Sequence, residues 1–174
     1  MAVQIFRYAT KDKILDFEDW MSLEPKKNKL RVTLLEYGPD NKAKCILHHY
    51  LDPDAWKVVC WDLLMGRFEK WVDYKGTPGR EGKPEARILS LVRDERYRHP
   101  YILRLARGRG EVIGAGAVRM VGQPEESLTL LLPEFEAKRL SLACLDYIRA
   151  WELIHFRERE RREGEGHSAR KGET

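Results

Sequence analysis

The chain has 174 residues, of which 43% are hydrophobic and 34% are charged, and its formal net charge is +4. This length fits one domain, and the apolar fraction is sufficient for a packed core. The sequence contains no apolar run of the ~20 residues that a membrane helix needs and no stretch of signal-peptide type near Met1, so it predicts a soluble, cytoplasmic protein.

The first third of the chain is predicted to form strands. Val3–Thr10, Leu30–Tyr37 and Ala43–Leu51 are rich in β-branched, aromatic and aliphatic residues. Residue types at Gly38–Asn41 are those of a turn. The polar segment Lys11–Lys29 predicts either a long hairpin connection or a short helix.

A helix is expected next, because the apolar period changes from two to between three and four. Asp52 is a candidate N-cap, and Pro53 fits the first helical position. An apolar face follows, and Gly66 provides a C-terminal stop. The residues of that face are Trp56, Val59, Cys60, Leu63 and Leu64.

Strand patterns resume in the second half of the chain. The segments are Phe68–Lys75, Arg87–Arg93, Tyr101–Arg107, two short stretches within 111–121, and Ser127–Leu132. Pro133 opens a second, long helix. The Gly- and Pro-rich segment Gly76–Pro84 is the best internal boundary. We therefore expect one α+β domain over residues 1–156, with halves of about 1–75 and 86–156.

The segment after Phe156 consists almost entirely of charged and small residues. It has no apolar face to bury, so we expect residues 157–174 to be a disordered, charged tail. The helix before it is apolar over much of its circumference, which is typical of a helix buried on several sides. We therefore expect a homodimer or higher homo-oligomer assembled through this C-terminal helix.

An internal repeat relates the two halves. Shifting the first half by 84 residues places Trp56 on Leu140 and Cys60 on Cys144. Each half then consists of several strands followed by one helix, and such a repeat determines the fold class. The expected fold is α+β, with two antiparallel β-units that are each closed by a helix.

This order of elements over residues 3–156 resembles the Whirly family and the positive-cofactor-type transcriptional coactivators. The resemblance implies antiparallel sheets that present polar and aromatic side chains to single-stranded nucleic acid, with helices packed behind them. The Lys-Gly-Lys signature of plant Whirly proteins is absent. The resemblance therefore assigns no individual binding residue.

The charge distribution points to the same function. Residues 67–110 hold 12 Lys and Arg against 6 Asp and Glu, whereas the flanking segments are neutral or acidic. Arginine grips phosphate with a fork of donors, and nearby aromatic rings can stack on bases. We expect binding of single-stranded nucleic acid, with DNA favoured over RNA. The expected binding residues are Trp71, Tyr74, Lys75, Arg87, Arg93, Arg98, Tyr101, Arg104 and Arg107. For Trp71 and Tyr101, a place in the core is the alternative.

Other chemistry receives little support. Cys45, Cys60 and Cys144 are widely spaced, with no C-x-x-C pair, so the sequence predicts neither a zinc site nor a disulfide framework. The glycines of Gly108–Gly116 are followed by a strand pattern, which favours a hairpin or bulge over a phosphate loop. We assign no catalytic residue, metal or cofactor, and a non-enzymatic role is favoured.

Two alternatives remain open. The first is a metal-dependent enzyme acting on nucleic acid, with His48, Asp52 and Asp54 as candidates. The second is a protein-interaction scaffold that uses the basic sheet for an acidic partner. Adjacent His48 and His49 point to opposite faces of a strand and cannot bind one metal together. Asp52 is expected to cap the first helix rather than to bind a metal.

Overall fold

The computed structural model describes residues 2–77, 83–114 and 117–170. The first half of the chain forms one antiparallel sheet, sheet 1, with its strands in chain order. Its strands are β1 (Gln4–Ala9), β2 (Lys13–Trp20), β3 (Lys29–Tyr37) and β4 (Ala43–Leu51), with a 3-10 turn at Pro25–Lys27 between β2 and β3. Helix α1 (Pro53–Leu64) follows directly.

The second half repeats this plan as sheet 2, which ends in helix α2 (Glu134–Arg170). The strands of sheet 2 are β5 (Lys70–Thr77), β6 (Glu85–Arg93), β7 (Tyr101–Ile113), β8 (Ala117–Met120) and β9 (Glu126–Leu132). All pairings are antiparallel; β7 pairs with β6 and β9 along its first part and with β8 beyond them. The expected α+β class, with two antiparallel sheets, two helices and a long C-terminal helix, is confirmed.

The division between the two halves differs from the expected one. β5 pairs with β6 along its whole length, so it belongs to sheet 2. The halves therefore meet between Leu64 and Lys70 rather than near residues 75–86. The Gly- and Pro-rich segment marks a connection within sheet 2, and most of it lies outside the described residues. A composition break identifies a turn, but it does not say which strands the turn joins.

Over the last strand and the helix of each half, the offset between the two repeats is 81 residues rather than 84. Leu51 ends β4 opposite Leu30 of β3, and Leu132 ends β9 opposite Tyr101 of β7. The buried positions of the helices agree with this offset: Trp56, Val59, Cys60 and Leu63 correspond to Ala137, Leu140, Ser141 and Cys144. An error of three residues goes unnoticed in a sequence comparison, because buried helix positions recur every three or four residues.

Strand β2 is the main element that the sequence reading missed. It occupies part of the segment expected to be a connection or a short helix. Leu15 and Phe17 point into the core and are fully buried, whereas Asp16 and Glu18 point outward. This alternation is the signal of a half-buried strand. The charged outward residues obscured it.

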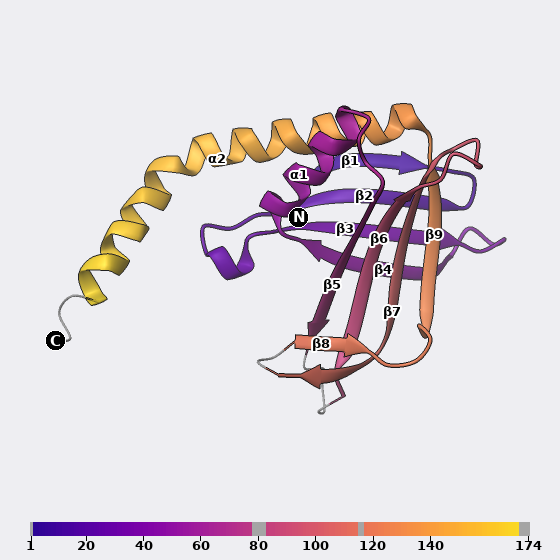
Figure 1. The fold of residues 1–174 in the computed structure, drawn as a ribbon, viewed down its shortest axis with the longest axis horizontal. Coiled ribbons are helices and arrows are strands. Elements are labelled where there is room, and N and C mark those ends of the chain that lie inside the picture. Colours follow the sequence, from indigo (N-terminus) through magenta and orange to yellow (C-terminus); the bar gives the residue numbers. More distant parts are fainter. Residues whose placement is uncertain (1, 78–82, 115–116, 171–174) are drawn as a thin grey trace.

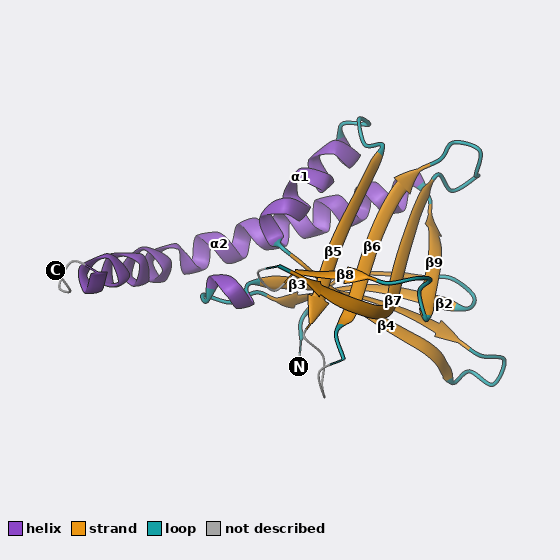
Figure 2. Cartoon of the chain, turned by 60° about the horizontal axis from the view of Figure 1, so that its bottom comes forward, coloured by secondary structure: helices purple, strands orange, loops and turns teal. Residues whose placement is uncertain are grey.

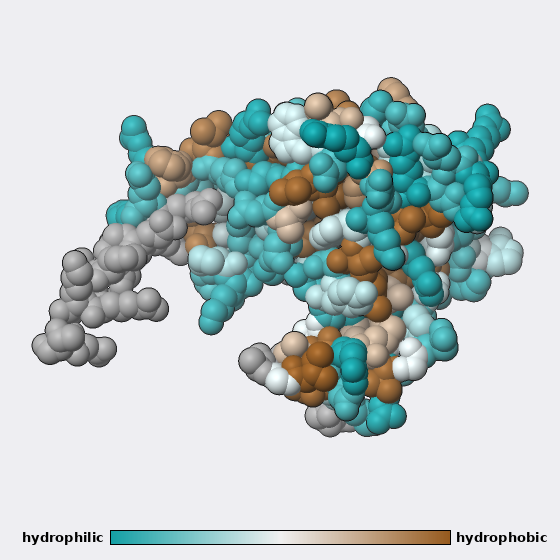
Figure 3. All heavy atoms as spheres, in the orientation of Figure 1, coloured by the Kyte–Doolittle hydropathy of each residue, from teal (hydrophilic) through white to brown (hydrophobic). Residues whose placement is uncertain are grey.

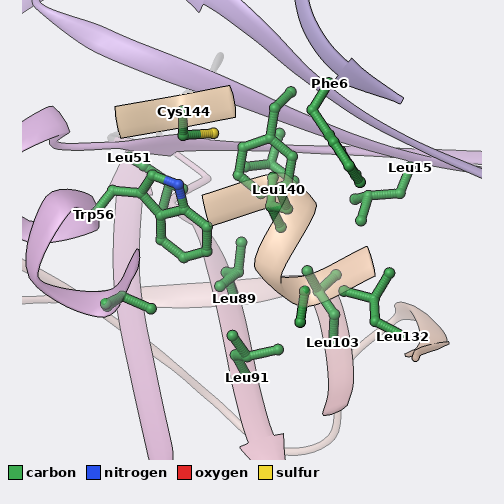
Figure 4. Close-up of a cluster of buried hydrophobic side chains, with 14 of the residues drawn as sticks. Phe6, Leu15, Leu51, Trp56, Leu89, Leu91, Leu103, Leu132, Leu140 and Cys144 are labelled. Carbon is green, nitrogen blue, oxygen red and sulfur yellow. The ribbon is translucent and has the colours of Figure 1, made fainter. Parts of the chain in front are cut away.

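The two sheets share one hydrophobic core. Their strands cross steeply, and β4 contacts four strands of sheet 2 (Figures 1 and 2). Side chains from both sheets and both helices converge between them, among them Leu15, Leu89, Trp56 and Leu140 (Figure 4). Because both inner faces pack on this core, the outer faces of the two sheets point away from each other.

The first part of α2 closes this core beside α1. Burial raises the pKa of the Cys60 thiol, which lies against Cys144 and Ser141 of α2. Arg139 donates a hydrogen bond to the carbonyl of Arg7 and lies over the Phe6 ring. Among the described residues, no helix combines the length and the apolar character needed to cross a membrane.

The second part of α2 projects from the body of the molecule (Figure 1). Leu153, Ile154 and Phe156 are 71%, 76% and 57% exposed. The helix continues to Arg170, so residues 157–170, expected to be disordered, are helical. Arginine and glutamate are good helix formers and can extend a helix without burying a face. Residues 171–174 lie outside the described part.

The β7–β8 arm folds back over the outer face of sheet 2, and small residues make room for it. A Cβ on Gly76 would lie 2.0 Å from the Cβ of Val118, and a Cβ on Gly110 would lie 2.4 Å from its Cγ1. Gly114 directly follows β7 and has a φ of 57°. The hairpin role expected for the Gly108–Gly116 segment is confirmed for its described part, in which Gly110 pairs with Met120 and Gly114 follows β7.

The hydrogen bond between Tyr147 and Asp19 provides the first prediction. The Tyr147 hydroxyl donates to Asp19 at 2.6 Å and joins α2 to β2. Burial and this bond raise the pKa of Tyr147 to about 12. Replacing Tyr147 with Phe should lower the free energy of unfolding by about 1.5 kcal/mol, the low end for a bond to a charged group. Asp19 keeps its bond from the Met21 amide, which limits the cost.

The stabilisation by the Tyr147–Asp19 hydrogen bond should decrease as the pH rises. The neutral tyrosine is favoured in the folded state, so its contribution is complete below the unfolded pKa of about 10 and is lost as pH rises towards about 12. Urea unfolding of Tyr147→Phe and wild type should therefore differ more near neutral pH than above about pH 11. Tyr97→Phe, which removes an exposed hydroxyl, is the control. A difference that grows with pH would contradict this account.

The exposed segment of α2 leads to a second prediction. We expect the protein to self-associate through Leu153, Ile154 and Phe156, since a projecting helix with such residues gains by burying them. Light scattering at micromolar concentration should give at least a dimer mass. Changing all three residues to Ser should give a monomer with an unchanged circular dichroism spectrum of the sheets. A wild-type monomer would rule out this assembly.

Candidate nucleic-acid interface

The expected binding residues fall on both faces of sheet 2. Successive residues of a strand alternate between the faces. Tyr74 and Arg104 point outward, whereas Lys75, Arg87 and Arg107 lie in one row on the inner face. The basic segment 67–110 therefore does not form a single surface, because counting charges along the chain ignores this alternation.

The part of the outer face of sheet 2 that the β7–β8 arm leaves uncovered is the better candidate, and we call it the open face. Figure 3 looks onto it and shows apolar and pale spheres over β5–β7, bordered by hydrophilic ones. Its residues are Lys70, Val72, Tyr74, Ile88, Ser90, Val92, Ile102, Arg104, Ser127, Thr129 and Leu131. All are exposed or half-buried.

The chemistry of the open face is cationic and aromatic. Tyr74 is 65% exposed. Lys70 and Arg104 are exposed, and neither forms an ion pair within the described residues. None of the outward-pointing residues that define this face is Asp or Glu. Two cations without carboxylate neighbours on the face create a site that favours phosphate, while the tyrosine ring and the aliphatic side chains favour bases.

The inner row behaves differently because every cation in it is already paired. Lys75 contacts Asp52 and Asp73, at 2.7 and 3.4 Å. Arg87 pairs with Glu85 at 2.7 Å, and Arg107 pairs with Glu126 of β9. This row is electrically balanced, so it offers less to a phosphate than the sequence suggested.

Asp52 takes part in this balance instead of capping α1. It occupies the N-cap position, but its side chain makes no capping hydrogen bond. Burial alone would raise its pKa, yet hydrogen bonds from Lys29 and Lys75 lower it. The expected capping role is therefore wrong, and the carboxylate ties β3 and β5 to the start of the helix.

Two expected stacking residues belong to the core. Tyr101 is 1% exposed and packs against Phe68. Trp71 is half-buried, and its ring lies 5.6 Å from that of Trp56. Tyr101 therefore has no open ring face for a base, and Trp71 lies on the inner side of the sheet. Both follow the strand alternation that places their neighbours Leu91 and Leu103 inside.

Arg93 and Arg98 lie near the end of sheet 2 where α1 meets β5. Arg93 donates to the carbonyl of Gly66, pairs with Glu95 and lies over the Tyr101 ring. Arg98 is exposed in the connection between β6 and β7. Neither belongs to the open face.

The residues proposed for a metal enzyme do not converge. His48 points outward from β4 and bonds to Thr33, whereas His49 is buried with its Nε2 2.7 Å from Asp73. Asp52 is held by two lysines. No cluster of three or more metal-binding side chains exists within the described ranges.

Sequence reasoning missed Lys70, which is next to Trp71 but faces outward. It also missed an aromatic group on the outer face of sheet 1, made of Trp20, Arg31 and Tyr50. The alternation within Lys13–Trp20 could have identified that face, since Glu18 and Trp20 share one side of the strand.

The chain was compared with models of known protein families and with curated proteins, and neither comparison found a match.

Proposed function

We propose that this protein binds single-stranded nucleic acid across the open face of sheet 2. One observation carries the proposal: Tyr74, Lys70 and Arg104 lie exposed on a sheet face whose described outward residues include no carboxylate. Unpaired cations attract the phosphates, and the exposed ring stacks on a base of any type. A duplex keeps its bases stacked inside, so the tyrosine has less to contact there.

The aliphatic centre of the open face fits this role. Val72, Ile88 and Ile102 are partly exposed between the cations. They provide a flat apolar floor on which unstacked bases can lie. Because they read no base edges, we expect little sequence preference.

The same floor also supports a second candidate function, a scaffold that binds another protein. Half-exposed aliphatic residues on an open sheet suit a protein partner, and Lys70 and Arg104 would select an acidic one. This function requires no affinity for nucleic acid. Titration of the wild-type protein with single strands therefore separates the two candidates.

The main test is fluorescence anisotropy of a labelled oligo(dT) over a range of salt concentrations. Two phosphate contacts give a log–log slope of about −1.4, since each contributes about −0.7 on a single strand. Replacing Lys70 and Arg104 with Ala should weaken binding and bring the slope close to zero. Replacing Tyr74 with Ala should weaken binding by about 1–3 kcal/mol with little change in slope.

Arg98→Ala is the matched control, because Arg98 is an exposed arginine that lies off the open face. It should leave affinity and slope nearly unchanged. Circular dichroism should show that all variants are folded. The proposal fails if wild type does not bind single strands, or if Arg98→Ala has the effect expected of the Lys70 and Arg104 variant.

A further inference from the structure

The outer face of sheet 1 carries an ordered group of aromatic and cationic side chains, which we call the Trp20 platform. It consists of Trp20, Arg31 and Tyr50, from the neighbouring strands β2, β3 and β4. The Arg31 guanidinium lies 4.6 Å from the centre of the Trp20 ring. The Trp20 and Tyr50 rings meet edge to face, with centroids 5.6 Å apart.

Polar neighbours hold the platform in place. Glu18 accepts two hydrogen bonds from Arg31, at 2.8 and 2.9 Å, and one from the Thr33 hydroxyl at 3.0 Å. The hydrogen bond from Arg31 lowers the pKa of Glu18 and keeps it charged. Thr33 in turn contacts Nδ1 of His48 at 3.0 Å. Arg31 is therefore fixed over Trp20, and the tryptophan is pre-positioned before any ligand arrives.

Trp20 nevertheless remains accessible. It is 44% exposed, whereas Trp56 in the core is fully buried. A large aromatic ring at the end of a strand, supported by a guanidinium on one side, suits a planar aromatic ligand stacked on its free surface. The Trp20 ring is not part of the hydrophobic core.

The charges around the Trp20 platform favour an uncharged ligand. The arginines that face outward beside the platform are paired within the sheet, Arg31 with Glu18 and Arg7 with Asp16 at 2.7 Å. Such a neutral surface offers little to a phosphate but suits an uncharged ring. We propose that the Trp20 platform is a second binding site that stacks a nucleobase. This proposal rests on the proposed function. The Trp20 platform lies on the side of the molecule opposite the open face.

The two sites then differ in a measurable way. Binding at the open face depends on cations and falls with salt, whereas stacking on the Trp20 platform releases few counterions. The single strand is then held through phosphates and bases on sheet 2 and through bases alone on sheet 1. A variant that lacks the open-face contacts should retain a weak affinity that salt barely changes.

The test uses the full chain with Lys70, Tyr74 and Arg104 all changed to Ala. Anisotropy of labelled oligo(dA) should show residual binding with a salt slope near zero. Adding Trp20→Ala should reduce this residual affinity by roughly fivefold or more, as expected for the loss of one stacked base. Trp20→Phe should retain part of it. Trp61→Ala in the same background is the matched control, because Trp61 is 52% exposed on α1.

The outcomes separate the two proposals. If the open-face variant has no residual binding, or if Trp20→Ala changes it no more than Trp61→Ala does, the platform is not a site. The open-face proposal survives that result, because it depends on the loss caused by Lys70, Tyr74 and Arg104 in the otherwise wild-type chain. If Trp20→Ala alone abolishes binding while the open-face variants do not affect it, the open-face proposal fails and the platform stands.

Discussion

The architecture depends on the packing of Trp56 between the two sheets. This α1 side chain stacks on Phe17 of sheet 1, with centroids 5.2 Å apart, and meets Trp71 of sheet 2 at 5.6 Å. One buried indole thus joins a helix to both sheets. Because both sheets bury their inner faces against this core, each has one outer face left for solvent. The surfaces available for binding follow from that division.

The division also gives the two outer faces different chemistry. On sheet 2 the carboxylates near the basic strands, such as Asp73 and Glu126, point inward and neutralise the inner cations. On the open face, Lys70 and Arg104 have no ion-pair partner among the residues that the structure describes. On sheet 1 the outward carboxylates Asp16 and Glu18 pair with outward arginines, so that face is neutral. A protein with a modest net charge can therefore carry one cationic outer face and another whose charges are balanced.

Much of the fold could be predicted from local patterns. Local patterns involve only residues that are close in sequence. They include the alternation within strands, Pro53 and Pro133 at the helix starts, and Gly66 at the end of α1. The predictions were wrong where the structure depends on pairing with a strand that is distant in sequence. The pairing of β5 with β6 moves the boundary between the halves, and the register of β4 and β9 corrects the repeat offset.

The site was less predictable than the fold. Tyr74 and Arg104, which were expected to bind nucleic acid, are exposed on the outer face of sheet 2. The pairing of Arg107 with Glu126, by contrast, depends on β9, 19 residues further along the chain. Tyr101 was misassigned because aromatic composition does not distinguish a buried ring from an exposed one. Trp20 was missed because its strand was not recognised. In each case the deciding fact is which face of which sheet a residue occupies.

The central claim is that the two outer sheet faces, and not the basic segment as a whole, contact nucleic acid. Photo-crosslinking to a bromouracil-substituted single strand, followed by mass spectrometry of the peptides, tests it most directly. The account predicts adducts on the β5 peptide at Tyr74 and on the β2 peptide at Trp20. Adducts concentrated instead on α1, or on the inner row at Lys75, Arg87 and Arg107, would contradict it.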